Sequence, residues 1–190
     1  MKIVVGLGNP GAKYRANRHN AGYLVLSELA SRFAKTPPRA RFHADTLEIQ
    51  LNRPSNHGTV LLLCPTTYMN HSGRSVAEAV RFYKLLPEDI FVICDDLDLP
   101  FAKIRIRAEG GCGGQKGLKD IARLLGTEKF PRLRFGIGRP PARVDPADYV
   151  LSDFSAEEKK ELPLALKIAA DAVECSLTEG LAEAMNKYNG

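Results

Sequence analysis

The densest group of chemically useful side chains lies near the start of the chain. Residues 13–23 hold His19, a base that works near neutral pH, together with two amides, three cations and two phenols. They follow the short β-branched run 3–5 and the glycine-rich loop 6–11. Open α/β sheets bind ligands beyond the carboxyl ends of their strands. We therefore expect a functional site at this loop.

An acidic cluster could supply the partner of this base. Asp95, Asp96 and Asp98 directly follow the apolar run 90–94. A carboxylate that accepts the N–H of a histidine fixes its tautomer, so that the other ring nitrogen can take a proton from water. His19 with Asp95 is one such pair, while Asp96 and Asp98 are near-equal rivals, and a lone histidine can also serve only as a cap or in packing. Since neither G-x-S-x-G nor a cysteine signature occurs, water is the economical nucleophile.

Amide side chains follow two further apolar runs. Asn9 lies after the run 3–5, and Asn70 lies after the run 60–64. Loops at one end of a sheet converge, so these amides are expected to share a cleft with Asp95. They could hold a carbonyl group or stabilise an oxyanion.

The glycines of the first loop match a second pattern. Gly6, Gly8 and Gly11 fit G-x-G-x-x-G, which binds dinucleotides when a helix opens at the third glycine and an acidic residue ends the second strand. Here helical periodicity begins only near Asn20, and Glu28 lies inside that helix. The pattern therefore argues against a nucleotide cofactor.

Strand and helix patterns alternate along the chain. Predicted strands lie at 3–5, 45–52, 60–64, 90–94, 103–107 and 133–137, and predicted helices at 20–33, 76–85, 118–125 and 155–177. The strands 45–52 and 60–64 form a hairpin across a turn at 54–58. This order predicts an α/β fold, a single domain over residues 1–190 with a twisted mixed β-sheet flanked by α-helices. The segment 139–155 is a polar, proline-rich excursion.

Positive charge is concentrated in one part of the chain. Residues 103–143 hold eleven lysines and arginines against three acids, about +8, whereas the whole chain of 190 residues carries +5. The ordinary explanation is a solvated basic face. The alternative is a surface for a polyanion, and because few exposed aromatics accompany the cations, phosphate or a duplex backbone is the better match.

Other features restrict the class of protein. No run of about 18 apolar residues is present, and no charged-then-apolar leader precedes the first strand, so we expect a cytoplasmic protein outside the membrane. The four cysteines are widely spaced without a C-x-x-C pair, and the four histidines are scattered. This spacing predicts buried free thiols, no metal site and no cofactor.

Several motifs in order resemble those of the bacterial-type peptidyl-tRNA hydrolases. They are VGLGNPG at 5–11 with Tyr14 and RHN at 18–20, PTTYMNHSG at 65–73, DDLDLP at 95–100, the glycine-rich loop 109–117 and RLRFGIGRP at 132–140. The similarity covers nearly the whole chain. It implies a monomeric α/β enzyme, phosphorylase/hydrolase-like in fold, that hydrolyses the ester joining a peptide to the 3′ ribose of tRNA.

The resemblance also implies roles for individual residues. His19 would be the base and Asp95 its partner, while Asn9 and Asn70 would position water and peptide. The cleft would be lined by Tyr14 and Met69, and the tRNA 5′ phosphate would be held by Arg107 and Arg134. The excursion 139–155 would be a mobile flank of the cleft.

One motif departs from the family pattern. Most members read Gly-Gly-His-Asn-Gly where this chain has Gly113-Gly114-Gln115-Lys116-Gly117. Lys116 can donate hydrogen bonds but cannot accept them, so it could stabilise an oxyanion but not orient a water as an acceptor. The alternative function is therefore a tRNA- or structured-RNA-binding protein on the same scaffold that has lost hydrolysis.

Overall fold

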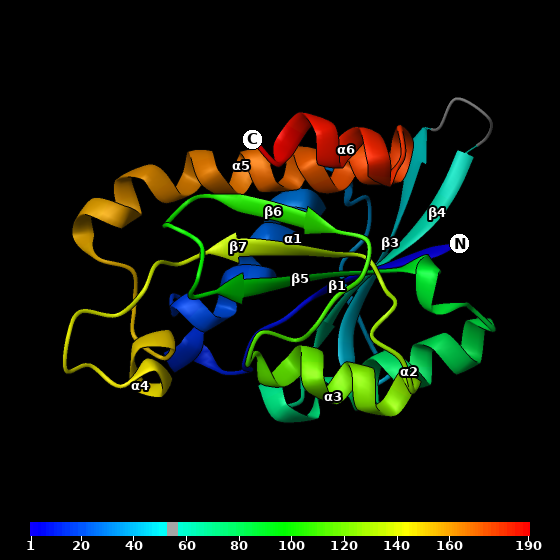
Figure 1. Cartoon of the computed structure of the whole chain (residues 1–190). Helices are drawn as coiled ribbons and strands as arrows, with labels where there is room; N and C mark the ends of the chain where they lie inside the picture. Colours follow the sequence, from blue (N-terminus) through cyan, green and yellow to red (C-terminus); the bar gives the residue numbers. More distant parts are fainter. Residues whose placement is uncertain (53–56) are drawn as a thin grey trace.

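A mixed β-sheet forms the centre of the molecule in the computed structural model, which describes residues 1–52 and 57–190 (Figure 1). Over these residues the sheet has seven strands in the order β2-β3-β4-β1-β5-β7-β6. The strands are β1 (Lys2–Gly6), β2 (Arg39–Arg41), β3 (Ala44–Asn52), β4 (His57–Pro65), β5 (Ile90–Asp96), β6 (Ile104–Arg107) and β7 (Arg132–Gly136). Neighbours β4, β1, β5 and β7 run parallel, whereas β2, β3 and β6 join as antiparallel strands. The α/β class and the mixed sheet are confirmed.

Helices cover both faces of this sheet. They are α1 (Ala21–Phe33), α2 (Ser72–Tyr83), α3 (Lys116–Leu125), α4 (Pro146–Val150), α5 (Ala156–Thr178) and α6 (Leu181–Tyr188), with the short 3-10 helices η1 (Ala12–Tyr14), η2 (Arg18–Asn20), η3 (Met69–His71) and η4 (Pro87–Asp89). Figure 1 shows α5 and α6 along one side of the sheet and α2 and α3 along the other. No helix of the described ranges is both long and apolar enough to cross a bilayer.

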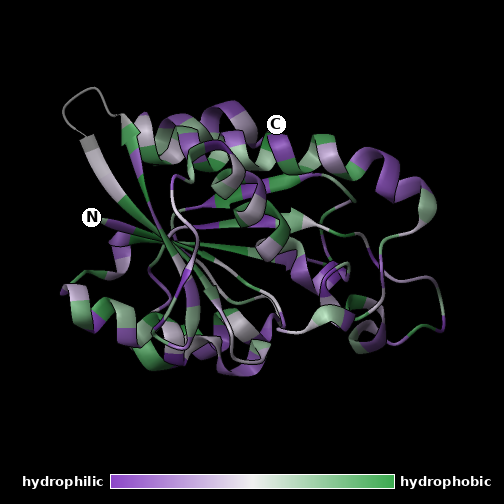
Figure 2. Ribbon diagram, turned by 180° about the vertical axis from the view of Figure 1, so that it is seen from behind, coloured by the Kyte–Doolittle hydropathy of each residue, from purple (hydrophilic) through white to green (hydrophobic). Residues whose placement is uncertain are grey.

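The central strand β1 is buried on both faces, as expected for a parallel strand under two helical layers. Val4 packs with the α1 and α5 layer, while Ile3 and Val5 pack with the α2 and α3 layer. Green strands running between helices of mixed colour show the same pattern in Figure 2. The sheet is therefore a rigid platform for the loops that leave its carboxyl edge.

Glycines bring α1 unusually close to β1. A Cβ on Gly6 would lie 2.5 Å from the carbonyl oxygen of Gly22, and a Cβ on Gly22 would lie 2.4 Å from the backbone nitrogen of Leu7. Gly6 thus serves the close packing of α1 on β1, and α1 begins only at Ala21. Only the three-residue 3-10 helix η1 follows Gly11, in place of the α-helix that a dinucleotide site requires there.

Some element boundaries differ from the sequence-based expectation. The helix expected from residue 76 begins at Ser72, and the segment 139–155 contains the short helix α4. The end of the chain forms α6, whose apolar spacing from Leu181 to Tyr188 is helical. The turn expected at 54–58 lies partly outside the described residues, and His57 is the first residue of β4.

Candidate active site

A cleft of about 590 Å³ opens beyond the carboxyl ends of the parallel strands. The predicted site residues that line it are Asn9, His19, Met69, Asn70, Asp95, Lys116 and Arg134. Tyr14 stands beside the cleft, with its ring centroid 6.5 Å from that of the lining residue Tyr68. The expectation that loops after β1, β4 and β5 converge in one cleft is confirmed.

His19 and Asp95 form a direct pair in this cleft. Nδ1 of His19 lies 2.8 Å from Oδ2 of Asp95, and the two side chains are only 12% and 4% exposed. An ionised carboxylate can only accept, so Nδ1 carries the proton and donates it. The other ring nitrogen, Nε2, is then an acceptor suited to a water or a substrate. Helix η2 supplies His19, and the end of β5 supplies Asp95.

Hydrogen bonds to the side chain and to the backbone of Asn9 hold this residue in place. Its Oδ1 accepts the backbone N–H of Met69 at 2.8 Å. Its own backbone N–H donates to Oδ1 of Asn20 at 2.8 Å, and Nδ2 of Asn20 donates to the Asn9 carbonyl at 3.0 Å. Because Oδ1 is engaged, the Nδ2 amide of Asn9 is the group that can donate to a ligand.

The three acidic residues at and just after the end of β5 make different contacts. Asp96 forms an ion pair with Arg134, with Oδ2 and Nη1 3.3 Å apart, and its Oδ1 accepts the backbone N–H of Asp98. Asp98 pairs with the exposed Arg139 at 2.5 Å. Asp95 is the member of this cluster that contacts His19.

The predicted phosphate-binding arginines lie on neighbouring antiparallel strands. In the register of β6 and β7, Arg105 stands opposite Arg134, and Arg107 stands opposite Arg132. Opposite residues of antiparallel strands point to the same face, so all these arginines share one face of the sheet. Arg107 is exposed and does not line the cleft. It lies two positions along β6 from Arg105, which stands opposite the cleft residue Arg134.

Three comparisons with known proteins lead to the same family. A sequence model of the family described as peptidyl-tRNA hydrolase matches residues 3–190. The peptidyl-tRNA hydrolase of Rhodopirellula baltica is 50% identical over 189 residues, covering 100% of this chain and 97% of that protein. That of Symbiobacterium thermophilum is 47% identical over 188 residues, covering 99% and 98%. The crystal structure of peptidyl-tRNA hydrolase from Acinetobacter baumannii superposes with a TM-score of 0.88 at 34% identity, covering 100% of this chain and 95% of that one.

The chain belongs to the peptidyl-tRNA hydrolase family. The family resemblance expected from the motifs is therefore confirmed.

Within this family framework, Gln115 is a residue of the cleft to which sequence reasoning gave no role. Its amide nitrogen Nε2 donates to Oδ1 of Asp95 at 3.0 Å and lies 3.1 Å from Sδ of Met69. Gln115 thus binds the carboxylate oxygen that His19 leaves free. The available signal was its place in the Gly-Gly-Gln-Lys-Gly loop.

Arg18, the residue before His19, is a second residue to which sequence reasoning gave no role. It is 6% exposed, donates to Oε2 of Glu158 at 2.6 Å and to Oγ of Ser152 at 2.8 Å, and lies over the ring of Tyr149. These contacts tie η2 to the segment after α4, and α4 contributes Pro146, Ala147 and Val150 to the cleft lining. Arg18 therefore fixes one flank of the cleft beside His19.

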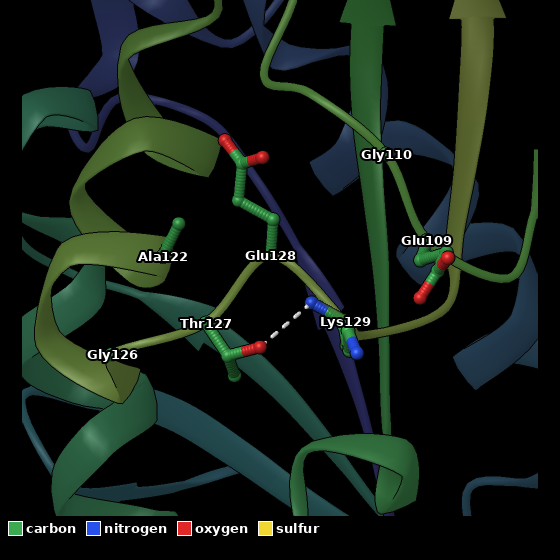
Figure 3. Close-up of a pocket in the computed structure, with 7 residues that line it drawn as sticks. All are labelled: Glu109, Gly110, Ala122, Gly126, Thr127, Glu128 and Lys129. Atoms are coloured by element: carbon green, nitrogen blue, oxygen red, sulfur yellow. Dashed lines mark hydrogen bonds between the residues drawn. The ribbon is translucent and has the colours of Figure 1, made fainter.

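Arg132, counted above among the surface cations, is buried. It is 1% exposed, and its guanidinium donates to the backbone carbonyls of Gly110, Glu128 and Phe130. Burial lowers the pKa of this guanidinium. Gly110 and Glu128 also border a second hollow of about 560 Å³ (Figure 3), in which Thr127 Oγ1 accepts the backbone N–H of Lys129. Arg132 therefore anchors the glycine-rich loop from beneath.

Metal ligands do not gather in the described parts of the chain. Over residues 1–52 and 57–190, no group of three or more histidine, cysteine, aspartate or glutamate side chains is arranged to hold a metal ion.

Proposed function

We propose that the chain hydrolyses the ester bond between a peptide, or an N-blocked amino acid, and the 3′ ribose of tRNA. The reaction would return tRNA from prematurely released peptidyl-tRNA. The observation that carries the proposal is the part-buried His19–Asp95 pair in the lining of the cleft, in a chain that matches peptidyl-tRNA hydrolases over nearly its whole length.

His19 is the general base of the proposed mechanism. Its Nε2 removes a proton from a water as the water oxygen attacks the ester carbonyl carbon. Asp95 holds the Nδ1–H tautomer and stabilises the imidazolium that forms. When the tetrahedral intermediate collapses, the C–O bond to the ribose breaks and the imidazolium returns its proton to the 3′ oxygen. The products are a free peptide acid and a tRNA with a free 3′ hydroxyl.

The remaining residues of the cleft bind and polarise the substrate. The oriented Nδ2 amide of Asn9 donates to the ester carbonyl as it becomes an oxyanion. Lys116, exposed at the first position of α3, adds a cationic donor for the same oxyanion. Asn70, Met69 and Tyr14 hold the peptide along the cleft.

Arg107 and Arg134 bind phosphate of the tRNA in this proposal. Both belong to the arginine face of β6 and β7, and Arg134 also lines the cleft. Cations on a rigid sheet bind a phosphate backbone by releasing its counterions. Arg134 belongs both to the cleft lining and to this surface, so the proposed ester site and the proposed phosphate site adjoin at this residue.

The proposal includes a monomeric, cytoplasmic protein made of one domain over residues 1–190. Light scattering during size-exclusion chromatography measures the molar mass in solution and so tests whether the protein is a monomer.

The decisive test is release of peptide from a purified N-blocked aminoacyl-tRNA, with the natural protein and Lys116→Asn compared side by side. Robust turnover by the natural protein supports the hydrolase and shows that lysine serves at position 116. Tight tRNA binding without turnover, restored by Lys116→Asn, would instead identify an RNA-binding protein that has lost hydrolysis.

A further inference from the structure

We propose that Gln115 is a positioning residue that holds the Asp95 carboxylate in place for His19. Gln115 is 9% exposed and stands at the N-cap of α3, directly before Lys116. Its amide reaches Asp95 on one side and the backbone of α3 on the other. The glycine-rich loop and the base are therefore joined through one side chain.

The contacts of Gln115 allow a single orientation of its amide. Oε1 accepts the backbone N–H of Leu118 at 2.9 Å, while Nε2 donates to Oδ1 of Asp95 at 3.0 Å. Reversing the amide would place Oε1 against a carboxylate and NH2 against another N–H, so both contacts would be repulsive. The helix cap thus forces the donor end of Gln115 toward Asp95.

The length of this side chain exceeds what the cap alone requires. Serine, threonine, aspartate and asparagine are the preferred N-caps because their short side chains reach the N–H two or three residues ahead. Glutamine is one methylene longer than asparagine, and its amide nitrogen reaches Asp95. The site also makes room for it, since a Cβ on Gly117 would lie 3.0 Å from Gln115 Oε1 and 2.6 Å from Met69 Sδ.

Both oxygens of Asp95 are consequently fixed. His19 holds Oδ2 at 2.8 Å and Gln115 holds Oδ1 at 3.0 Å, so the carboxylate cannot rotate without breaking a hydrogen bond. The amide is neutral and does not titrate, so it orients the carboxylate without adding a charge beside the base. By orienting this carboxylate, Gln115 increases the fraction of time that His19 spends as the productive Nδ1–H tautomer.

Two variants separate this role from capping. Gln115→Ser keeps an N-cap oxygen but removes the amide N–H that reaches Asp95. Gln115→Met keeps most of the side-chain volume but removes both this amide N–H and the capping oxygen. Only Gln115→Met is expected to lower the unfolding temperature clearly. Both variants should lower kcat between about 10-fold and 100-fold at unchanged KM, a part of the roughly 100- to 10,000-fold that a positioned base contributes.

The kinetic measurement rests on the proposed hydrolase function, so a second measurement is made without substrate. Nitrogen-15 NMR of the imidazoles reports which ring nitrogen of His19 carries the proton. We expect the Nδ1–H form in the natural protein and a shift toward the Nε2–H form, usual for free imidazole, in both variants. If both variants keep the His19 signals of the natural protein, the positioning role of Gln115 is wrong, whether or not the protein hydrolyses peptidyl-tRNA.

Discussion

Asp95 and Asp96 are neighbours at the end of β5, yet their carboxylates bind different partners. Asp95 contacts His19 at 2.8 Å, whereas Asp96 pairs with Arg134 at 3.3 Å. Asp95 therefore contacts the proposed base, and Asp96 pairs with the arginine that is proposed to bind tRNA. A single strand end links the chemical step to the proposed recognition of the nucleic acid.

Asparagine substitutions at these neighbours should have different effects. In Asp95→Asn, Gln115 Nε2 still donates to the oxygen of the new asparagine. The NH2 group of that asparagine then faces Nδ1 of His19, which has to accept a hydrogen bond instead of donating one. Nε2 then carries the proton and cannot act as a base, and we expect kcat to fall by about 100- to 10,000-fold. The matched variant Asp96→Asn should keep kcat near that of the natural protein. Single-turnover hydrolysis measures both, and equal losses would contradict the separation of roles.

Removing the base should stop turnover without releasing the tRNA. His19→Ala deletes the group that activates water, and we expect a loss of about 100-fold or more in kcat. The affinity of the His19→Ala variant for tRNA should stay nearly unchanged, because the proposed phosphate contacts lie on β6 and β7. Filter binding at fixed salt measures the affinity, and persistent hydrolysis would remove His19 from the role of general base.

Among the described residues, the sequence was sufficient to predict every strand except the short β2 (Arg39–Arg41), as well as the converging loops and the pairing of His19 with an acid. Apolar runs identify buried strands, and polar residues after them meet at one edge of a parallel sheet. Periodicity could not choose among Asp95, Asp96 and Asp98, because that choice depends on how each side chain leaves the strand end. The family resemblance named Asp95 as the partner, and the structure shows the contact between Asp95 and His19.

Contacts between distant parts of the chain were beyond sequence reasoning. Arg18 meets Glu158 across 140 residues, and Gln115 meets Asp95 through a helix cap, so neither pair leaves a periodic signal. Arg132 was counted as a surface cation because charge alone does not reveal burial. These residues are found only when the packing of the glycine-rich loop and of the cleft flank is known.

The proposed phosphate contacts should be visible in the salt dependence of binding. Each of Arg107→Ala and Arg134→Ala is expected to weaken tRNA binding and to lower the slope of log K against log salt by roughly 0.7–0.9. Arg123→Ala is a suitable control, because Arg123 is exposed but pairs with Asp120 at 2.6 Å. An unchanged slope in either test variant would place that arginine outside the interface.

Arg18 should matter for stability as well as for the shape of the cleft. Arg18→Ala removes the charged partner of Glu158, whose side chain is 18% exposed and whose Oε2 keeps the backbone N–H of Ser155, and removing one member of a largely buried ion pair costs up to about 3–5 kcal/mol. The control Lys159→Ala breaks an exposed pair with Asp153, which should cost less than about 1 kcal/mol. Urea unfolding measures the two changes in the free energy of unfolding, and similar values would contradict the anchoring role of Arg18.

Alkaline pH should destabilise the fold through Cys94, a thiol in the cleft wall. Cys94 is 1% exposed, and burial raises its pKa above the ordinary value of 9.0, with a smaller contribution from Asp95. Below pH 9 the thiol is protonated in both the folded and the unfolded chain. As the pH rises above 9 the unfolded thiol ionises while the folded one keeps its proton, so the free energy of unfolding falls. Cys94→Ala should be less stable at neutral pH because it leaves a cavity, but its stability should fall less steeply between pH 9 and 11. Parallel slopes for the two proteins in urea titrations over this range would show that Cys94 does not contribute to the alkaline loss.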